Sequence, residues 1–449
     1  MVISAAKILT ILALLSLFLY GTSAVARKTK INAELLRKIV HSGLGLICAV
    51  FPWVFHSTWE LIILCIGVIA VLLCARYHPV YKEKLGTGLY CVKRKSIGDL
   101  LFGVIVVVLF HYSQGEQPGE HALYVLPILI LTLSDSAAAL VGTRYGKHTF
   151  NIVGGQKSWE GCLAFFAVTF ALTVLVLSCL SPLALTDILL IAAIVALIGS
   201  MVEAVSWHGW DNLFVPLGLF LLLQSLMAKA TSELLLAFAL LALIVLSAQR
   251  LRQHSQLNTH ALLGALVAAY FFLETSGLQW LLPPLIVFAV HIMLSSLQSS
   301  EKPASYHIDS VISIVATGIF WLFLSRQSGF VYAYYLFVLS MAIHIQIMVL
   351  LRIRAQRRRT AEYALVMLAV LFSGWVLLPA LLIYYPLTQP HLVIYGFGLL
   401  IMLLGGILLQ IKTDENTSLS RWVIQGIYAA IGSILGLIPI LYYNFYYAL

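Results

Sequence analysis

The sequence predicts an all-α, polytopic transmembrane protein. Of its residues 61% are hydrophobic and only 10% are charged, whereas soluble domains carry about 25% charged residues. Apolar runs long enough to cross a bilayer recur along the whole chain, and short polar loops separate them. Composition and pattern together exclude an ordinary soluble protein.

About sixteen membrane spans are expected from these apolar runs. Eight lie in the first half, near residues 8–25, 39–55, 59–75, 97–112, 123–141, 160–179, 187–204 and 213–227. The others lie near residues 233–247, 260–276, 278–296, 308–324, 330–350, 363–384, 391–410 and 422–441.

The distribution of basic residues predicts one orientation for all spans. The segment RKTK at 27–30 follows the first apolar run, which makes that run an anchor with its N-terminus outside. The basic loops then all fall on the cytoplasmic side, at 76–95, 144–157, 249–252 and 352–359, whereas loops 113–121, 181–187 and 386–391 lack Lys and Arg. This asymmetry accounts for the net charge of +9, so the charge does not indicate a nucleic-acid partner.

Between Asp135 and Gly161 the chain concentrates polar residues that are expensive inside a membrane. Asp135 and Glu160 are suited to a hard divalent cation such as Mg²⁺. Positive charge comes from Arg144, Lys147 and Lys157, and the glycines let backbone N–H groups approach phosphate. These glycines are Gly142, Gly146, Gly155 and Gly161. The stretch therefore predicts a nucleotide-phosphate site, although Asp135 and Lys157 can instead form one buried ion pair with the glycines as helix-packing positions.

Two further polar segments fall on the same predicted side of the membrane. The first has helical spacing that places Glu34, Lys38 and His41 near one face. The second offers oxygen ligands for Mg²⁺, or a base, through Glu203, Asp211 and Asn212. Alone, each is explained by a topology signal or a capped loop. Their convergence with the Asp135 stretch favours an active site at the cytoplasmic face.

These motifs resemble the CTP-dependent polyprenol kinase family, which contains dolichol kinase and phytol kinase. The family signature D-x-x-A-x-x-x-G-x-x-x-G, followed by K-[TS]-x-E-G, is matched by Asp135, Ala138, Gly142, Gly146, Lys157, Ser158, Glu160 and Gly161. The upstream E-x-x-R-K-x-x-H is matched by Glu34, Arg37, Lys38 and His41, and the downstream motif by Glu203, Ser206, Gly209, Asp211, Asn212 and Pro216. Two departures are Ser136, where Thr is common, and a slightly long loop before Lys157.

The resemblance implies a lipid kinase that transfers the γ-phosphoryl group of CTP to a long-chain isoprenoid alcohol such as phytol, geranylgeraniol or a polyprenol. It implies catalytic roles for Asp135, Lys157, Glu160 and Asp211, and Mg²⁺ ligation by Asp135, Glu160 and Glu203. The expected nucleotide-binding residues are Arg37, Lys38, His41, Gly142, Arg144, Gly146, Lys147, Gly155, Ser158, Gly161 and Asn212. A phosphatidate-type cytidylyltransferase that makes a CDP-lipid stays open as an alternative, as does a lipid transporter or flippase.

Three domains are expected: an anchor at 1–30, a catalytic transmembrane domain at 31–228 and a helical domain of uncertain role at 229–449. The last domain weakly resembles the start of the phytyl-phosphate kinase family from Thr259 onward, but His344 stands where an acid and a threonine are expected. The chain is expected in a bacterial inner membrane or an organelle membrane, with its active site facing the cytoplasm.

Overall fold

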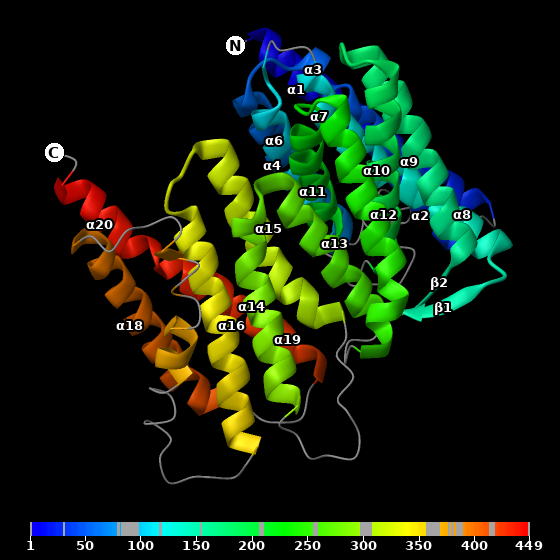
Figure 1. Ribbon diagram of the computed structural model, residues 1–449. Helices are drawn as coiled ribbons and strands as arrows, with labels where there is room; N and C mark the ends of the chain where they lie inside the picture. Colours follow the sequence, from blue (N-terminus) through cyan, green and yellow to red (C-terminus); the bar gives the residue numbers. More distant parts are fainter. Residues whose placement is uncertain are drawn as a thin grey trace. The chain divides into compact units, whose positions relative to one another are not determined.

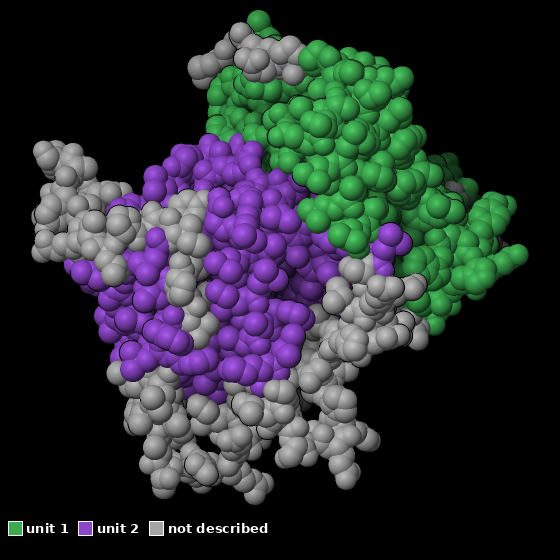
Figure 2. All heavy atoms as spheres, viewed as in Figure 1, with its two compact units in different colours: residues 1–243 green, residues 244–449 purple. Residues whose placement is uncertain are grey.

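The computed structural model describes most of the chain and divides it into two compact units. The described residues are 2–29, 32–78, 81, 98–115, 119–152, 155–205, 211–254, 259–296, 308–355, 369–375, 378, 381–382, 389–412 and 418–447. Unit 1 comprises Met1–Leu243 and unit 2 comprises Ile244–Leu449; Figure 2 colours them separately.

Helices make up nearly all of the described structure (Figure 1). Those of the first half are α1 (Val2–Lys28), α2 (Ala33–Ala49), α3 (Phe51–Val54), α4 (Thr58–Tyr77), α6 (Gly98–Tyr112), α7 (Glu120–Leu129), the π-helix η2 (Ile130–Ser134), α8 (Asp135–Tyr145), α9 (Trp159–Leu180), α10 (Leu185–Val205), α11 (Asp211–Leu226) and α12 (Thr231–His254). Those of the second half are α13 (Thr259–Ser276), α14 (Leu278–Ser296), α15 (Ile308–Ser328), α16 (Ala333–Ala355), α18 (Gln389–Lys412), α19 (Ser418–Leu435) and α20 (Leu437–Tyr447).

The all-α membrane architecture predicted from the sequence is confirmed. Within the described residues, nine helices are long and apolar enough to cross a bilayer, and six shorter apolar helices accompany them. Fifteen of the sixteen expected runs coincide with helices, and the run at 363–384 lies mostly outside the described residues. Many leucines and isoleucines on these helices are exposed, as expected where side chains face lipid.

In unit 1, helix α9 packs against α8 on one side and α10 on the other. Helix α2 crosses the α7–η2–α8 segment, and α11 contacts both α6 and α7. Between α8 and α9 the chain forms a short antiparallel hairpin of β1 (Thr149–Ile152) and β2 (Gly155–Ser158). Figure 1 shows this hairpin projecting beyond the ends of the two helices. It occupies the stretch that the sequence predicted to be a polar loop.

The fifth predicted span is one continuous helical rod from Glu120 to Tyr145, with a change of winding in its middle. Pro127 lies inside α7 and contributes no backbone N–H to the helix. Three residues later the five-residue π-helix η2 begins, and Asp135 is the first residue after it. Such π segments are uncommon and often lie at functional sites. The irregular backbone of this helix therefore lies directly before Asp135, which is its only acidic residue after Glu120.

Unit 2 is built around α16, which is almost wholly buried. Helices α14, α15, α18 and α19 pack on it, and α13 packs on α14 and α15. Helix α15 also contacts α19 directly. The core of unit 2 therefore includes a three-helix junction of α15, α16 and α19.

Candidate functional site

The first polar contact of the site joins α2 to α8. Lys38 Nζ lies 2.5 Å from Asp135 Oδ2 and also contacts the Asp135 carbonyl oxygen at 3.4 Å. The Lys38 side chain is only 4% exposed, whereas that of Asp135 is 26% exposed. The lysine is thus a buried counter-ion, and the carboxylate keeps partial access to its surroundings.

Helix α2 packs closely against the π segment beside this pair. A Cβ added at Gly45 would lie 2.0 Å from Thr132 Cγ2, so only glycine permits α2 to approach η2 this closely. His41 Nε2 lies 3.2 Å from the carbonyl oxygen of Leu131, and Ser42 Oγ contacts that of Thr132 at 3.4 Å. A π winding changes the i to i−4 hydrogen-bond ladder, and these two carbonyl oxygens of η2 accept bonds from α2.

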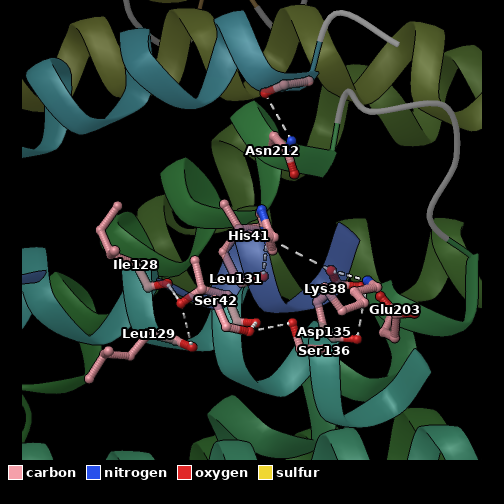
Figure 3. A network of polar contacts seen from close by, with 12 residues as sticks. Lys38, His41, Ser42, Ile128, Leu129, Leu131, Asp135, Ser136, Glu203 and Asn212 are labelled. Carbon is pink, nitrogen blue, oxygen red and sulfur yellow. Dashed lines mark hydrogen bonds and ion pairs between the residues drawn. The ribbon is translucent and has the colours of Figure 1, made fainter. Parts of the chain in front are cut away.

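A second hydrogen bond fixes the side of α8 that faces α2. Ser42 Oγ donates to Ser136 Oγ at 2.8 Å. His41 Nε2 stands 3.9 Å from Asp135 Oδ2 on the same side (Figure 3). Two side chains of α2, Lys38 and His41, therefore face the Asp135 carboxylate, and Ser42 faces the neighbouring Ser136.

The second ion pair of the site joins the hairpin to α10. Lys157 Nζ on β2 lies 2.6 Å from Glu203 Oε1 and also donates to the Glu203 carbonyl oxygen. Lys38 and Asp135 both lie within electrostatic range of Glu203, and Figure 3 draws Glu203 beside them. The two pairs therefore form one network of two acids and two lysines, contributed by α2, α8, β2 and α10.

This network revises the ion pair considered from the sequence. Asp135 and Lys157 were a possible pair, but Asp135 takes Lys38 as its partner and Lys157 takes Glu203. Arg37 is half-buried and adds positive charge within range of Asp135. An arrangement of alternating cations and carboxylates has the charges required for a polyphosphate and a divalent cation together.

The glycines of the motif serve helix packing. A Cβ added at Gly161 would lie 2.9 Å from the carbonyl oxygen of Ala138 and 3.4 Å from Gly142 Cα, so α8 and α9 cross at these two glycines. Small residues at such crossings let membrane helices approach closely. A Cβ at Gly146 would meet the Gly142 carbonyl oxygen at 2.3 Å and Ser158 Oγ at 2.8 Å.

Two of the glycine N–H groups expected to face phosphate bond within the protein instead. Gly161 N donates to Ser158 Oγ at 3.1 Å, which caps the start of α9, and Gly146 N donates to the Gly142 carbonyl oxygen at 3.1 Å. The packing alternative thus describes Gly142, Gly146, Gly161 and Ser158 better than the phosphate-loop expectation does. Gly155 begins β2, opposite Ile152 in the hairpin.

Glu160 lies apart from the other two expected metal ligands. Its Oε1 is 2.8 Å from Nδ1 of His148 and accepts from the His148 backbone N–H at 3.2 Å. Across the described part of the chain, no three His, Cys, Asp or Glu side chains are grouped so that they could hold a metal ion. A joint cation site of Asp135, Glu160 and Glu203 is therefore not formed, and Glu160 braces the base of the hairpin.

The remaining predicted residues lie around this network. Arg144 and Lys147 are exposed, with the Arg144 guanidinium 5.3 Å from the ring of Tyr145. Asn212 Nδ2 donates to the Gly98 carbonyl oxygen at 2.9 Å and so joins the starts of α11 and α6 (Figure 3). The side chains of Glu34 and Asp211 lie outside the described residues, as do Ser206 and Gly209 entirely.

Four contributors to the site were missed by sequence reasoning: Ser42, Ser136, Gly45 and Thr132. Ser136 was noted only as a departure from the family motif, yet its hydroxyl is the partner of Ser42. A usable signal was Pro127, because proline inside an apolar run often accompanies a local change of helix winding.

Comparisons with known proteins agree with the place of this network in the chain. A family model described as the Cytidylyltransferase family matches residues 1–205. Phytol kinase from Synechocystis sp. is 33% identical over 189 residues, which are 41% of this chain and 76% of that protein. No solved structure matches the chain. The residues that the family model matches include all four members of the two ion pairs.

Proposed function

The chain belongs to the family of CTP-dependent isoprenoid-alcohol kinases that includes phytol kinase, and on this basis we propose that it phosphorylates a long-chain isoprenoid alcohol. The alcohol oxygen attacks the γ-phosphorus of CTP, the bond from that phosphorus to the β-phosphate oxygen breaks, and CDP leaves. The hydroxyl proton passes to a carboxylate of the site. Phytol, geranylgeraniol and polyprenols are the acceptors that fit a membrane-embedded enzyme of this family.

The network of Lys38, Asp135, Lys157 and Glu203 is the observation that supports this function. Phosphoryl transfer depends mainly on positioning and on stabilising negative charge. The two ammonium groups are suited to the β- and γ-phosphates, because lysine binds phosphate as a point charge. Arg37 and His41 lie beside Asp135 and are suited to complete the phosphate clamp.

Asp135 and Glu203 are the residues that we propose to hold Mg²⁺. Magnesium sites that act on nucleotides commonly use one or two carboxylates together with substrate phosphates, so the absence of a third carboxylate is compatible with this role. When bound, the cation neutralises charge that develops on the transferring phosphoryl group. We also assign to Glu203 the role of the base that accepts the hydroxyl proton, and the sequence motif offers Asp211 as the alternative.

In the free protein each carboxylate is already neutralised by a lysine. A nucleotide draws the lysines toward its phosphates and leaves the carboxylates available to the cation. Nucleotide and cation are therefore expected to bind together. Each lysine exchanges a carboxylate for a phosphate, so little unpaired charge arises inside the membrane protein.

The site is proposed to face the cytoplasm, in a bacterial inner membrane or an organelle membrane. The basic loops of the chain fall on one side of the predicted topology, and the hairpin with Lys157 belongs to one of them. CTP is a cytoplasmic metabolite, and a lipid alcohol can present its hydroxyl at that face while its chain stays in the bilayer.

Cytidylyl transfer to a lipid phosphate is the second candidate, because the matching family model is described as a cytidylyltransferase family. The two reactions differ in the phosphorus that is attacked. A membrane assay with CTP labelled at either the α- or the γ-phosphate separates them, with phytol, geranylgeraniol or a polyprenol as acceptor. Label from the γ-position in the lipid phase supports the alcohol kinase, whereas label only from the α-position supports cytidylyl transfer.

The Asp135→Asn variant tests the site in the same assay. It should lower turnover by at least about a hundredfold, the effect of losing one well-placed electrostatic group, while insertion into the membrane is unchanged. Glu233→Gln, at an exposed position in the first turn of α12, is the matched control. A variant at Asp135 with the wild-type rate would contradict the assignment.

A further inference from the structure

Two membrane spans of unit 1 are joined by the β1–β2 hairpin, and basic and aromatic side chains gather at their ends. One span ends at Tyr145 and the next begins at Trp159. Arg144, Tyr145 and Lys147 are exposed, and Trp159 is 67% exposed. Because the hairpin connects two spans, these side chains lie at a surface of the bilayer. The proposed reaction uses none of them.

Arg144 points away from the network around Asp135. It is nine residues after Asp135 on the regular helix α8, which is about two and a half turns, so the two side chains lie on opposite faces about 14 Å apart along the axis. Ala138 and Gly142, where α8 meets α9, share the Asp135 face. Arg144 instead shares its face with Leu140, which is 37% exposed. This placement does not suit the nucleotide role expected from the sequence.

Trp159 begins the lipid-facing side of α9. Exposed residues recur at every fourth position of this helix: Trp159, Leu163, Ala167, Ala171 and Leu175. Gly161, which meets α8, lies nearly on the opposite side of the helix. A tryptophan at the end of a lipid-facing stripe is typical of the interface between membrane and water.

Backbone and ring contacts join the hairpin to Trp159. The Trp159 backbone N–H donates to the His148 carbonyl oxygen at 3.0 Å, and the ring centres of Phe150 and Trp159 are 5.5 Å apart. Lys147 directly precedes His148, and Arg144 is three residues earlier. Arg144, Lys147, Phe150 and Trp159 therefore form one region, which we term the hairpin surface.

The two basic residues of the hairpin surface have no ion-pair partner among the described residues. The other charged groups nearby are already engaged. Lys157 is paired with Glu203, and Glu160 is held by His148 and by the backbone of Lys147. The hairpin surface therefore presents net positive charge beside an apolar, lipid-facing ring.

We propose that the hairpin surface binds the head group of an anionic phospholipid. Its phosphate supplies the negative charge for the guanidinium and ammonium groups, while the indole ring of Trp159 lies at the level of the head groups. A zwitterionic lipid carries its own cation and offers no net charge. Lys157 extends from the same hairpin to Glu203, so the bound lipid also anchors the element that carries this lysine.

Photo-crosslinking of the full-length protein in phosphatidylcholine nanodiscs tests the proposal. The probe is either phosphatidylglycerol or phosphatidylcholine, each with a diazirine in the acyl chain close to the glycerol. Labelled peptides of residues 140–163 are quantified by mass spectrometry. Phosphatidylglycerol should label them at least about fivefold more than phosphatidylcholine, which corresponds to about 1 kcal/mol for one basic residue near the membrane surface.

Arg144→Gln and Lys147→Gln should each lower the labelling by phosphatidylglycerol about fivefold and leave the labelling by phosphatidylcholine unchanged. Lys28→Gln is the matched control, because Lys28 is an exposed basic residue at the end of another span. It should keep the wild-type labelling of residues 140–163. In the wild-type protein, raising the salt concentration from 0.1 to 1 M should remove most of the preference, because the screening length falls from about 10 to about 3 Å.

Two outcomes would overturn the proposal. One is equal labelling by the two probes, which would mean that exposure to lipid alone explains the contact. The other is loss of the labelling when CTP is added at constant ionic strength, which would mean that the basic residues bind the nucleotide. The labelling does not depend on catalysis: it should persist in Asp135→Asn, and also if the wild-type protein proves to transfer no γ-phosphate.

Discussion

Replacing Lys38 with methionine should destabilise unit 1 strongly, because it leaves Asp135 without its counter-ion. Lys38 is 4% exposed, and its ammonium is the partner nearest to the Asp135 carboxylate, at 2.5 Å; His41 follows at 3.9 Å. Methionine has a similar volume, so the variant removes the charge without creating a large cavity. The perturbation is therefore mainly electrostatic.

The magnitude follows from the burial of the pair. Breaking a buried ion pair by removing one partner costs about 3–5 kcal/mol. Since Asp135 is 26% exposed, the lower limit of about 3 kcal/mol applies. For a unit of this size each kcal/mol lowers the melting temperature by about 2–4 °C, which predicts a decrease of about 6–12 °C.

A double-mutant cycle measured by thermal unfolding in detergent isolates the pair. Lys38→Met with Asp135→Leu removes both charges, and the double variant should regain most of the lost stability because replacing both members of a buried pair is often nearly neutral. Lys28→Met, at the exposed end of α1, is the control and should change the melting temperature little. Additive effects of the two substitutions on stability would refute the pairing. A Lys38→Met protein that melts within 2 °C of wild type would refute it as well, since that difference corresponds to roughly 1 kcal/mol of unfolding free energy or less.

Three further predictions concern helix packing, hydrogen bonding and cation binding. Gly161→Ala should lower the free energy of unfolding by about 1–3 kcal/mol, because the added Cβ would lie 2.9 Å from the Ala138 carbonyl oxygen. The control is Gly21→Ala, which has nothing within 4 Å of its added Cβ and should be tolerated. Equal melting temperatures for the two variants would argue against the helix crossing at Gly161. Ser42→Ala should lower the free energy of unfolding by about 1 kcal/mol, because it removes the hydrogen bond to Ser136. The loss is measured as a decrease in melting temperature, and no decrease would mean that this bond does not stabilise the protein. Mn²⁺, followed by electron paramagnetic resonance, should bind the protein at least about tenfold more tightly with a non-hydrolysable CTP analogue than alone, and equal affinities would contradict the exchange of lysine partners.

Local pattern was sufficient to predict the helices and the region of the site. Apolar runs of span length identify membrane helices because an unsatisfied backbone is so costly in lipid. The alternation of spans then placed Lys38, Asp135 and Glu203 on one predicted side. Their meeting in one network agrees with that placement.

The pairing itself could not be predicted from the sequence. Lys38 and Asp135 are 97 residues apart, and Lys157 and Glu203 are 46 apart. Each acid had several basic residues on its own side of the membrane, and the choice among them depends on helix rotation. The glycine motif was ambiguous for a different reason: the absence of a Cβ permits phosphate binding and close helix packing equally well.

The π-helix η2 changes which side chains of this span share a face. A π turn accommodates one residue more than an α turn, so every side chain after Ser134 is rotated by about 100° relative to a regular α-helix. A helical wheel drawn through residues 120–145 at 3.6 residues per turn therefore assigns Asp135 and Ser136 to the wrong face. Deleting one residue from η2 would keep every motif intact in sequence yet turn the carboxylate away from α2. The register of five apolar and hydroxyl residues thus decides where the acidic group of the motif points.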